Sequence, residues 1–506
     1  MGRDLVMAFA FGDHPSVAAF MVAFRLSNLL RRLLGEGPFQ SAFIPYFEGL
    51  RVQDSGKATL FFRQLTSLIS LLLIALILIG EGGIFTALSQ GNLSEGNAEI
   101  VSLTGWLLPG ILFICLYGLN ISLLNCYDTF FIPSFAPFVC NAIWIGAAFS
   151  LRNQSPAEAM PTLAKWVAIG FFGQWLLTLP YTLKHVAGGW RDWFQWKIPT
   201  EVKGLAKSFA LGVIGVGAVQ INALVDALFA RYADISGPAY LWYSIRLEQL
   251  ALAVFGIACV STIVPRLSRA IKAGRLEEAQ SLFGFSYKRI MAVMVPCTIA
   301  LIVLGTAAVN LIYGRGHFSD LAISKTTLCL WAYGLGLVPT ALVILFSAIF
   351  YAHNNFRLPM LISLATVALN MVLNMLFVWG WKMGAISTAL ATSFSALANC
   401  WILYQFTKKM GWKPELSASR LLQITGASLF AGLCALGADY LFFQSSALMP
   451  LLGGVDFPRS AAVQLAHFST QLAAFVGGLL LYAYAFKTAD IQELIQDFVF
   501  KKRSIL

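Results

Sequence analysis

The chain has 506 residues, of which 58% are hydrophobic and only 12% are charged, and its mean hydropathy is +0.73. Soluble domains carry about 25% charged residues, so this composition excludes an ordinary soluble enzyme and indicates a polytopic membrane protein. The formal net charge of +11 would suit nucleic-acid binding. The basic residues instead gather in particular loops, as described below, and no nucleic-acid partner is expected.

Apolar runs of about 18 or more residues predict transmembrane helices. Thirteen such runs and a shorter first segment predict an all-α protein with about 14 transmembrane helices. The first segment lacks the layout of a cleavable signal peptide and resembles the tail of a helix whose beginning is missing. In chain order, the segments lie near residues 1–12, 16–33, 64–88, 103–125, 132–150, 162–184, 204–230, 239–262, 285–313, 322–352, 357–380, 384–406, 418–443 and 462–486.

The lysines and arginines give this map an orientation. If the first segment runs outward, most of them fall in the loops that would be cytoplasmic, and few fall in the others. Cytoplasmic loops of membrane proteins carry such an excess. The sequence therefore predicts that both termini are cytoplasmic.

Three sequence matches, in the same order and with a near-constant offset, indicate an internal repeat. They join "FRLSNLLR" at 24–31 to "IRLEQLAL" at 245–252, "FIP" at 43–45 to "IVP" at 263–265, and "NCYDTFFIPSFAPFVCN" at 125–141 to "YAHNNFRLPMLISLATVALN" at 351–370. A repeat of six helices restores the same orientation, which is one plan of secondary transporters. The predicted parts are an N-terminal lobe at 1–186, a cytoplasmic linker at 187–203, a C-terminal lobe at 204–407, two further helices within 418–486, and an interfacial amphipathic helix at 488–503.

Several arginines lie within predicted membrane helices. Arg25, Asn28 and Arg32 share one helix face, Arg31 lies one position off it, and Arg246 holds the place in the repeat that corresponds to Arg25. An arginine at the bilayer centre costs about 2.5–3.5 kcal/mol on insertion scales. A planar guanidinium can bind two phosphate oxygens at once, so these residues predict an anion-binding cavity.

Simpler interpretations of the same arginines stay open. Arg31 and Arg32 could end their helix and reach to the inner headgroups. Arg3, in the first segment, could pair with Asp4 or Glu36, and Glu248 could be the counter-charge of Arg246.

A second polar set suggests an ion site. Asp226 lies in the middle of its predicted helix, Asn370 and Asn374 are one turn apart on another, and Thr388 and Thr392 are one turn apart on the next. Carboxylate, amide and hydroxyl oxygens suit a monovalent cation or a proton relay. The alternative is hydrogen bonding between helices.

Motifs for chemistry and for nucleotide hydrolysis are absent from the sequence. There is no phosphate-binding GxxxxGK[ST], no HExxH and no GxSxG. The eight cysteines are scattered, with no CxxC, and most simply act as small hydrophobic residues. The sequence predicts a transporter rather than an enzyme.

The stretch "RLSNLLRRLLGEGPFQSAFIPYF" resembles the signature of the MurJ (MviN) family of bacterial lipid II flippases, in the multidrug/oligosaccharidyl-lipid/polysaccharide exporter superfamily. Further matches are "GRD" at 2–4, "FIPSFAP" at 131–137 and "WYSIRLEQLALAVFGIACVSTIVPRLSR" at 242–269. The resemblance covers the whole chain. It implies two six-helix lobes, two C-terminal helices that form a lipid-tail groove, and export of an undecaprenyl-pyrophosphate-linked peptidoglycan precursor by alternating access.

The resemblance also implies roles for individual residues. The substrate set is Arg3, Arg31, Arg32, Arg246 and Asn28, to which the helix-face analysis adds Arg25. The gate residue is Glu36, and a sodium site would use Asp226, Asn370, Asn374 and Thr392. No other cofactor is expected. The implied partners are lipid II, membrane lipids and proteins of cell-wall synthesis and division, with the chain a monomer in the inner membrane.

The chain also departs from the family pattern. The usual proline before Asn28 is Ser27, and Ile245 and Gln249 stand where family members often carry acids around the arginine at 246. A different exporter of the superfamily, for drugs or polysaccharide lipids, and a scaffold without transport are the alternatives. A drug exporter would not need several arginines in its cavity, and a scaffold would not need charge within the membrane.

Overall fold

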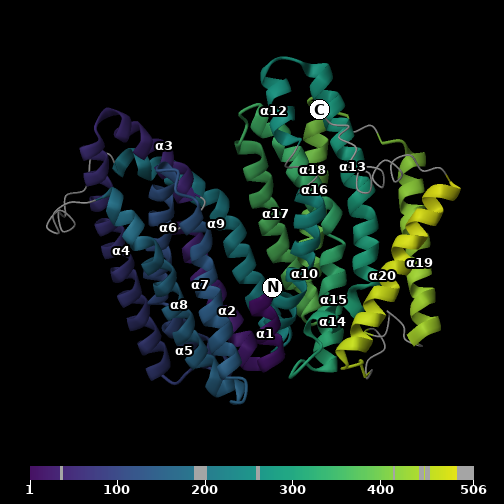
Figure 1. The fold of residues 1–506 in the computed structure, drawn as a ribbon, viewed down its shortest axis with the longest axis horizontal. Helices are drawn as coiled ribbons and strands as arrows, with labels where there is room; N and C mark the ends of the chain where they lie inside the picture. The colour runs from purple at the N-terminus through teal and green to yellow at the C-terminus, as the bar shows by residue number, and fades with distance from the viewer. Residues whose placement is uncertain are drawn as a thin grey trace. The chain divides into compact units, whose positions relative to one another are not determined.

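The computed structural model describes residues 1–34, 38–186, 202–257, 263–413, 416–443, 450 and 456–486 (Figure 1). Every regular element in these ranges is a helix, which confirms the predicted all-α class. The chain divides into two compact units, Met1–Leu228 and Phe229–Leu506, called here the N-terminal and C-terminal units. The predicted amphipathic helix at 488–503 and residues 187–201 of the predicted linker lie outside the described residues.

Several helices of the N-terminal unit begin at a recognisable signal. Asp54 caps one helix by accepting hydrogen bonds from the backbone amides of Gly56 (2.9 Å) and Lys57 (3.1 Å). Two helices start at Pro38 and Pro156, a residue suited to the first helical turn. The helices are α1 (Gly2–Phe11), α2 (Pro15–Leu34), α3 (Pro38–Gln53), α4 (Ser55–Ser89), α5 (Glu95–Leu107), α6 (Gly110–Cys126), α7 (Phe131–Ser150), α8 (Pro156–His185) and α9 (Val202–Ala233), whose last residues belong to the C-terminal unit.

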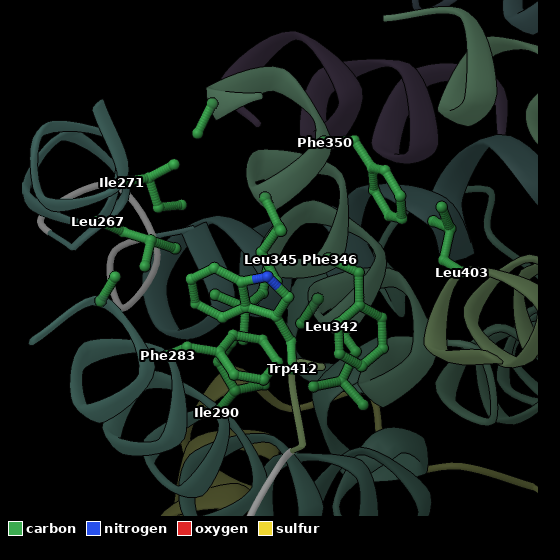
Figure 2. Packing of buried hydrophobic residues seen from close by; sticks show 14 of the residues in the cluster. Leu267, Ile271, Phe283, Ile290, Leu342, Leu345, Phe346, Phe350, Leu403 and Trp412 are labelled. Atoms are coloured by element: carbon green, nitrogen blue, oxygen red, sulfur yellow. The ribbon is translucent and has the colours of Figure 1, made fainter. Parts of the chain in front are cut away.

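The C-terminal unit contains the larger described core. Phe283, Phe346 and Trp412 pack closely at its centre (Figure 2), with the Phe283 and Trp412 rings 5.8 Å apart and edge to face. The elements are α10 (Gly237–Ala251), the π-helix η2 (Leu252–Ile257), α12 (Val264–Lys272), α13 (Leu276–Val303), α14 (Gly305–Tyr313), α15 (Asp320–Gly334), α16 (Leu337–Ala352), α17 (Arg357–Met375), the π-helix η3 (Leu376–Gly380), α18 (Ile386–Lys409), α19 (Ala418–Phe443) and α20 (Ala461–Ala485).

The same helix pairs pack in both units and in the same order. In the N-terminal unit, α2 packs on α5, α3 on α6, and α6 and α7 both pack on α8. In the C-terminal unit, α10 packs on α15, α12 on α16, and α16 and α17 both pack on α18. This recurrence is what the predicted parallel repeat requires. The last two helices, α19 and α20, pack on each other and against α13 and α14, so they stand outside the repeat as predicted.

Within the described residues, nine helices are long and apolar enough to cross a membrane, or ten if α5 and α6, which meet at a 46° bend, form one span. This makes the chain a membrane protein, but it does not reach the predicted count of 14. Three of the predicted spans are too short or carry too many charged residues to count as membrane-spanning helices. α1 has 10 residues, α10 has 15 residues before the π-helix, and α2 carries Arg25, Arg31 and Arg32. The count of 14 therefore stays a prediction.

Gly478 lets the backbones of α19 and α20 approach closely. A Cβ atom at Gly478 would lie 2.9 Å from the Ala431 Cα atom, whereas a Cβ atom at the neighbouring Gly477 would meet nothing within 4 Å. Small residues at helix interfaces in membranes let the backbones approach closely. We expect Gly478→Ala to lower the free energy of unfolding by about 1–3 kcal/mol. Gly477→Ala should not lower the free energy of unfolding, because alanine has a higher helix propensity than glycine. Thermal unfolding of both variants in detergent measures the difference, and equal melting temperatures would contradict this account of the contact.

Candidate functional site

Arg3 lies on an aromatic platform in the N-terminal unit. Its guanidinium carbon is 4.4 Å from the ring centroid of Trp144 on α7 and 5.7 Å from that of Phe24 on α2. Trp144 is 1% exposed and packs edge to face against Phe20 and Phe24. An Nη2 atom of Arg3 also lies 3.4 Å from an Asp4 carboxylate oxygen, so the simpler pairing with Asp4 exists as well. Glu36, the other suggested partner and the expected gate, lies outside the described residues.

The arginines of α2 differ in their surroundings. Arg31 is half-buried, and its Nε atom donates to Asn28 Oδ1 at 2.8 Å. Arg25 donates from Nη1 to the carbonyl oxygen of Ala223 on α9 at 2.7 Å. Arg32 is exposed. The structure thus brings Asn28 together with Arg31, although the sequence placed Arg31 one position away from the helix face that carries Asn28. The hydrogen bond of Arg25 joins α2 to α9.

Arg246 in the C-terminal unit repeats the aromatic arrangement of Arg3. Its guanidinium carbon lies 4.5 Å from the ring of Trp242, one turn earlier on α10, and its Nη1 atom donates to Gln249 Oε1 at 3.4 Å. A ring face held against a guanidinium restrains the plane in which its N–H groups donate. The suggested ion pair between Arg246 and Glu248 does not form among the described residues.

Three of the four expected sodium ligands meet between α17 and α18. Asn374 donates from Nδ2 to Asn370 Oδ1 at 2.7 Å, and Asn370 donates from Nδ2 to Thr392 Oγ1 at 3.4 Å. Both asparagines are buried. Asp226 belongs to the N-terminal unit, where it is 5% exposed and accepts a hydrogen bond from Asn222 at 3.2 Å. A joint site of all four residues stays a prediction. The oxygen atoms between α17 and α18 fit a monovalent cation, and their hydrogen bonds equally fit the structural alternative.

A buried polar stripe on α20 escaped the sequence analysis. Gln464, His467 and Gln471 follow i, i+3, i+7 spacing and are 1%, 8% and 0% exposed. His467 Nε2 makes a short contact with the fully buried Asp439 on α19, and Gln471 Nε2 lies 3.3 Å from His467 Nε2. Helical spacing of polar residues in an apolar run, with an acid in the preceding helix, is the signal that could have found them.

Comparison with known proteins decides the family. A family model described as lipid II flippase MurJ matches residues 7–461. A probable lipid II flippase MurJ of Chlamydia muridarum is 34% identical over 98% of this chain and 92% of its own length. Its counterpart from Chlamydia trachomatis serovar D is 32% identical over the same shares. This chain belongs to the MurJ family.

The fold agrees with the MurJ assignment. A solved lipid II flippase MurJ in an inward closed conformation, 22% identical, superposes with a TM-score of 0.75 and coverage of 96% of each chain. An inward-facing multidrug resistance transporter of the MATE family in the MOP superfamily is 13% identical, with a TM-score of 0.64 and coverage of 81% of this chain and 93% of its own. At these identities the likeness shows the fold alone, which this chain shares with both transporters. The predicted MurJ resemblance is confirmed.

Proposed function

We propose that the chain flips lipid II, the undecaprenyl-pyrophosphate-linked precursor of peptidoglycan, across the bacterial inner membrane by alternating access. Membership of the MurJ family along almost the whole chain carries this proposal. The activity would supply precursor for the cell wall and for cell shape. It needs transport rather than bond-breaking chemistry, so the chain would act as a transporter and not as an enzyme.

The arginines support a pyrophosphate substrate. Arg3 and Arg246 each rest on a tryptophan ring, and Arg31 is oriented by Asn28. A guanidinium whose plane is fixed loses little rotational freedom when it binds two phosphate oxygens. We assign pyrophosphate binding to Arg3, Arg31 and Arg32 in the N-terminal unit, where the exposed Arg32 can reach an anion from water, and to Arg246 in the C-terminal unit. Glu36 would act as the gate, and Arg25 would chiefly hold α2 to α9.

The energy source in this proposal is an ion gradient. Asn370, Asn374 and Thr392 would bind sodium between α17 and α18, Asp226 would be the ion-binding acid of the N-terminal unit, and a proton is the alternative ion. Both are compatible with the motif analysis, since the sequence has no nucleotide-binding motif.

Genetic complementation tests the proposed function. The chain is expressed in bacteria depleted of their own lipid II flippase, with its membrane level checked by immunoblot. We expect growth and rod or coccal shape to return. Cell lysis despite normal membrane levels would argue for another exporter activity or for a scaffold.

The orientation is a separate prediction. Positions Gln90 and Ala273 are both exposed, and each lies beside a glycine with positive φ that should not be replaced. In a cysteine-free background we expect a membrane-impermeant thiol reagent to label Gln90→Cys from outside the cell and Ala273→Cys only after lysis. Labelling of Ala273→Cys in intact cells would reverse the proposed orientation, in which both termini are cytoplasmic.

A further inference from the structure

The interface between α17 and α18 carries more polar side chains than the expected sodium ligands. Asn399 of α18 donates from Nδ2 to Thr366 Oγ1 of α17 at 3.3 Å. Thr366 lies four residues before Asn370, a separation of about 6 Å along the helix axis. The polar contact between the two helices therefore continues one turn from Asn370 toward the end of α18 at Lys409.

Ser395 adds a buried hydroxyl to this interface. It lies on the same face of α18 as Thr392 and Asn399, both of which contact α17. At about 100° per residue, the three side chains fall within about 60° of one another around the helix. Ser393 instead faces α15, since its hydroxyl donates to the Ala332 carbonyl oxygen at 2.6 Å. Ser395 is 7% exposed, so its hydroxyl belongs to the buried interface with α17.

Two oxygen atoms in this part of the interface are buried without a hydrogen bond. They are Ser395 Oγ and Asn399 Oδ1, to which no described residue supplies a partner. Buried polar atoms of folded proteins almost always have a partner, and an exception calls for a physical explanation such as a bound ion. An amide oxygen carries no proton, so Asn399 Oδ1 can only accept a hydrogen bond or bind a cation. Both atoms therefore point to a ligand between the helices.

The surroundings favour a cation with a single charge. α17 and α18 contain no aspartate or glutamate, and their charged residues are Arg357 at the start of α17 and Lys408 and Lys409 at the end of α18. Asn399 lies about 14 Å before Lys408 along the helix. α16, which also packs on α18, contains no charged residue. Neutral oxygens suit a monovalent ion, because the desolvation cost of an ion rises with the square of its charge.

We propose that Ser395, Asn399 and Thr366 form a second site for a monovalent cation. This site lies one helical turn from Asn370 and Thr392, on the cytoplasmic side of them in the predicted orientation. The proposal rests on the proposed function and deepens it, because it gives the coupling ion a second position. Sodium then passes between the first site and the cytoplasm in two short steps, each between oxygen atoms of α17 and α18.

Thermal unfolding of the purified protein in detergent measures sodium binding at the second site. Sodium chloride replaces choline chloride at constant ionic strength, and an ion that binds only the folded protein raises its melting temperature. Asn374→Leu serves as the background that disables the first site, and Thr392→Val takes its place if Asn374→Leu does not fold. We expect the melting temperature in this background still to rise with sodium.

Removing either unpartnered oxygen in that background should weaken the remaining response. We expect Ser395→Ala and Asn399→Leu each to raise the sodium concentration of half-maximal stabilisation about three- to tenfold, as the loss of one ligand oxygen predicts. Ser393→Ala is the matched control, because it removes the same hydroxyl from the other face of the same helix. It should lower the melting temperature, since a hydrogen bond is lost, and leave the response to sodium unchanged.

Three outcomes of the unfolding measurements would overturn the second site. The first is a folded background that no longer responds to sodium. The second is a response that Ser395→Ala and Asn399→Leu leave unchanged. The third is a shift with Ser395→Ala alone, which would make this serine a ligand of the first site.

Flipping in proteoliposomes under an imposed sodium gradient tests the two-step path. We expect the wild type and Ser393→Ala to respond to the gradient, and Ser395→Ala and Asn399→Leu to respond about three- to tenfold less. Variants that respond as the wild type does, or a wild type that flips lipid II without responding, would overturn the path. If the wild type flips nothing, the proposed function fails, and the unfolding measurements still decide whether the second site binds sodium.

Discussion

Arg246→Lys is expected to abolish complementation of a flippase-depleted strain almost as fully as Arg246→Ala. Lysine keeps the charge but offers a point donor in place of the planar guanidinium fork, whose central carbon lies 4.5 Å from the Trp242 ring centroid. Losing one charge-assisted hydrogen bond costs about 1.5–3 kcal/mol, or roughly ten- to a hundredfold in transport rate. Growth curves and immunoblots of membrane fractions measure the effect.

Arg25→Lys is the matched control for that substitution. Arg25 also carries a guanidinium within a predicted membrane helix, but it donates a hydrogen bond to the Ala223 carbonyl oxygen, and an ammonium can make that bond as well. We expect Arg25→Lys to grow nearly normally. Normal growth of Arg246→Lys would show that the position needs only positive charge, and the two-oxygen grip on pyrophosphate would be wrong.

His467→Leu is expected to destabilise the protein strongly. The substitution removes the histidine partner of the fully buried Asp439, and leaving a buried polar group short of a hydrogen bond costs about 1–3 kcal/mol. Thermal unfolding in detergent measures this loss. The paired variant Asp439→Leu/His467→Leu should recover most of the stability, because both polar groups are then gone.

The double-mutant comparison decides whether Asp439 and His467 act as a pair. If the double variant is as unstable as the sum of the two single variants, the residues contribute independently and the pair has no special role. A single His467→Leu variant that unfolds at the wild-type temperature would contradict the account outright.

The apolar runs of the sequence predicted where most helices lie, but they did not predict where those helices begin and end. The apolar run at 64–88 belongs to a helix that begins at Ser55, because Asp54 caps it there. The run at 285–313 likewise begins at Leu276, where Glu277 and Glu278 favour a first turn. Polar amphipathic turns continue a helix beyond the part that is apolar, and an apolar count cannot see them. The break of the run at 103–125, beside Pro109, was also missed.

The sequence likewise singled out some residues of the candidate sites but not the residues that contact them. The cost of arginine in lipid made Arg3 and Arg246 visible in the sequence, and the i, i+4 spacing did the same for Asn370 and Asn374. Partners on other helices were not visible in the sequence. The Trp144 ring under Arg3 and the Ala223 carbonyl at Arg25 come from helices distant in sequence. Such contacts depend on tertiary packing, which spacing along one helix does not encode.

Translocation of lipid II by the purified protein is the most direct test of the central claim. Fluorescent lipid II is placed in proteoliposomes, and the fraction of label that an external quencher can reach is followed over time. Wild-type protein should make label from the inner leaflet accessible, and Arg246→Lys at equal reconstitution should resemble protein-free liposomes. Wild-type protein that behaves like empty liposomes, with or without an ion gradient, would contradict the account.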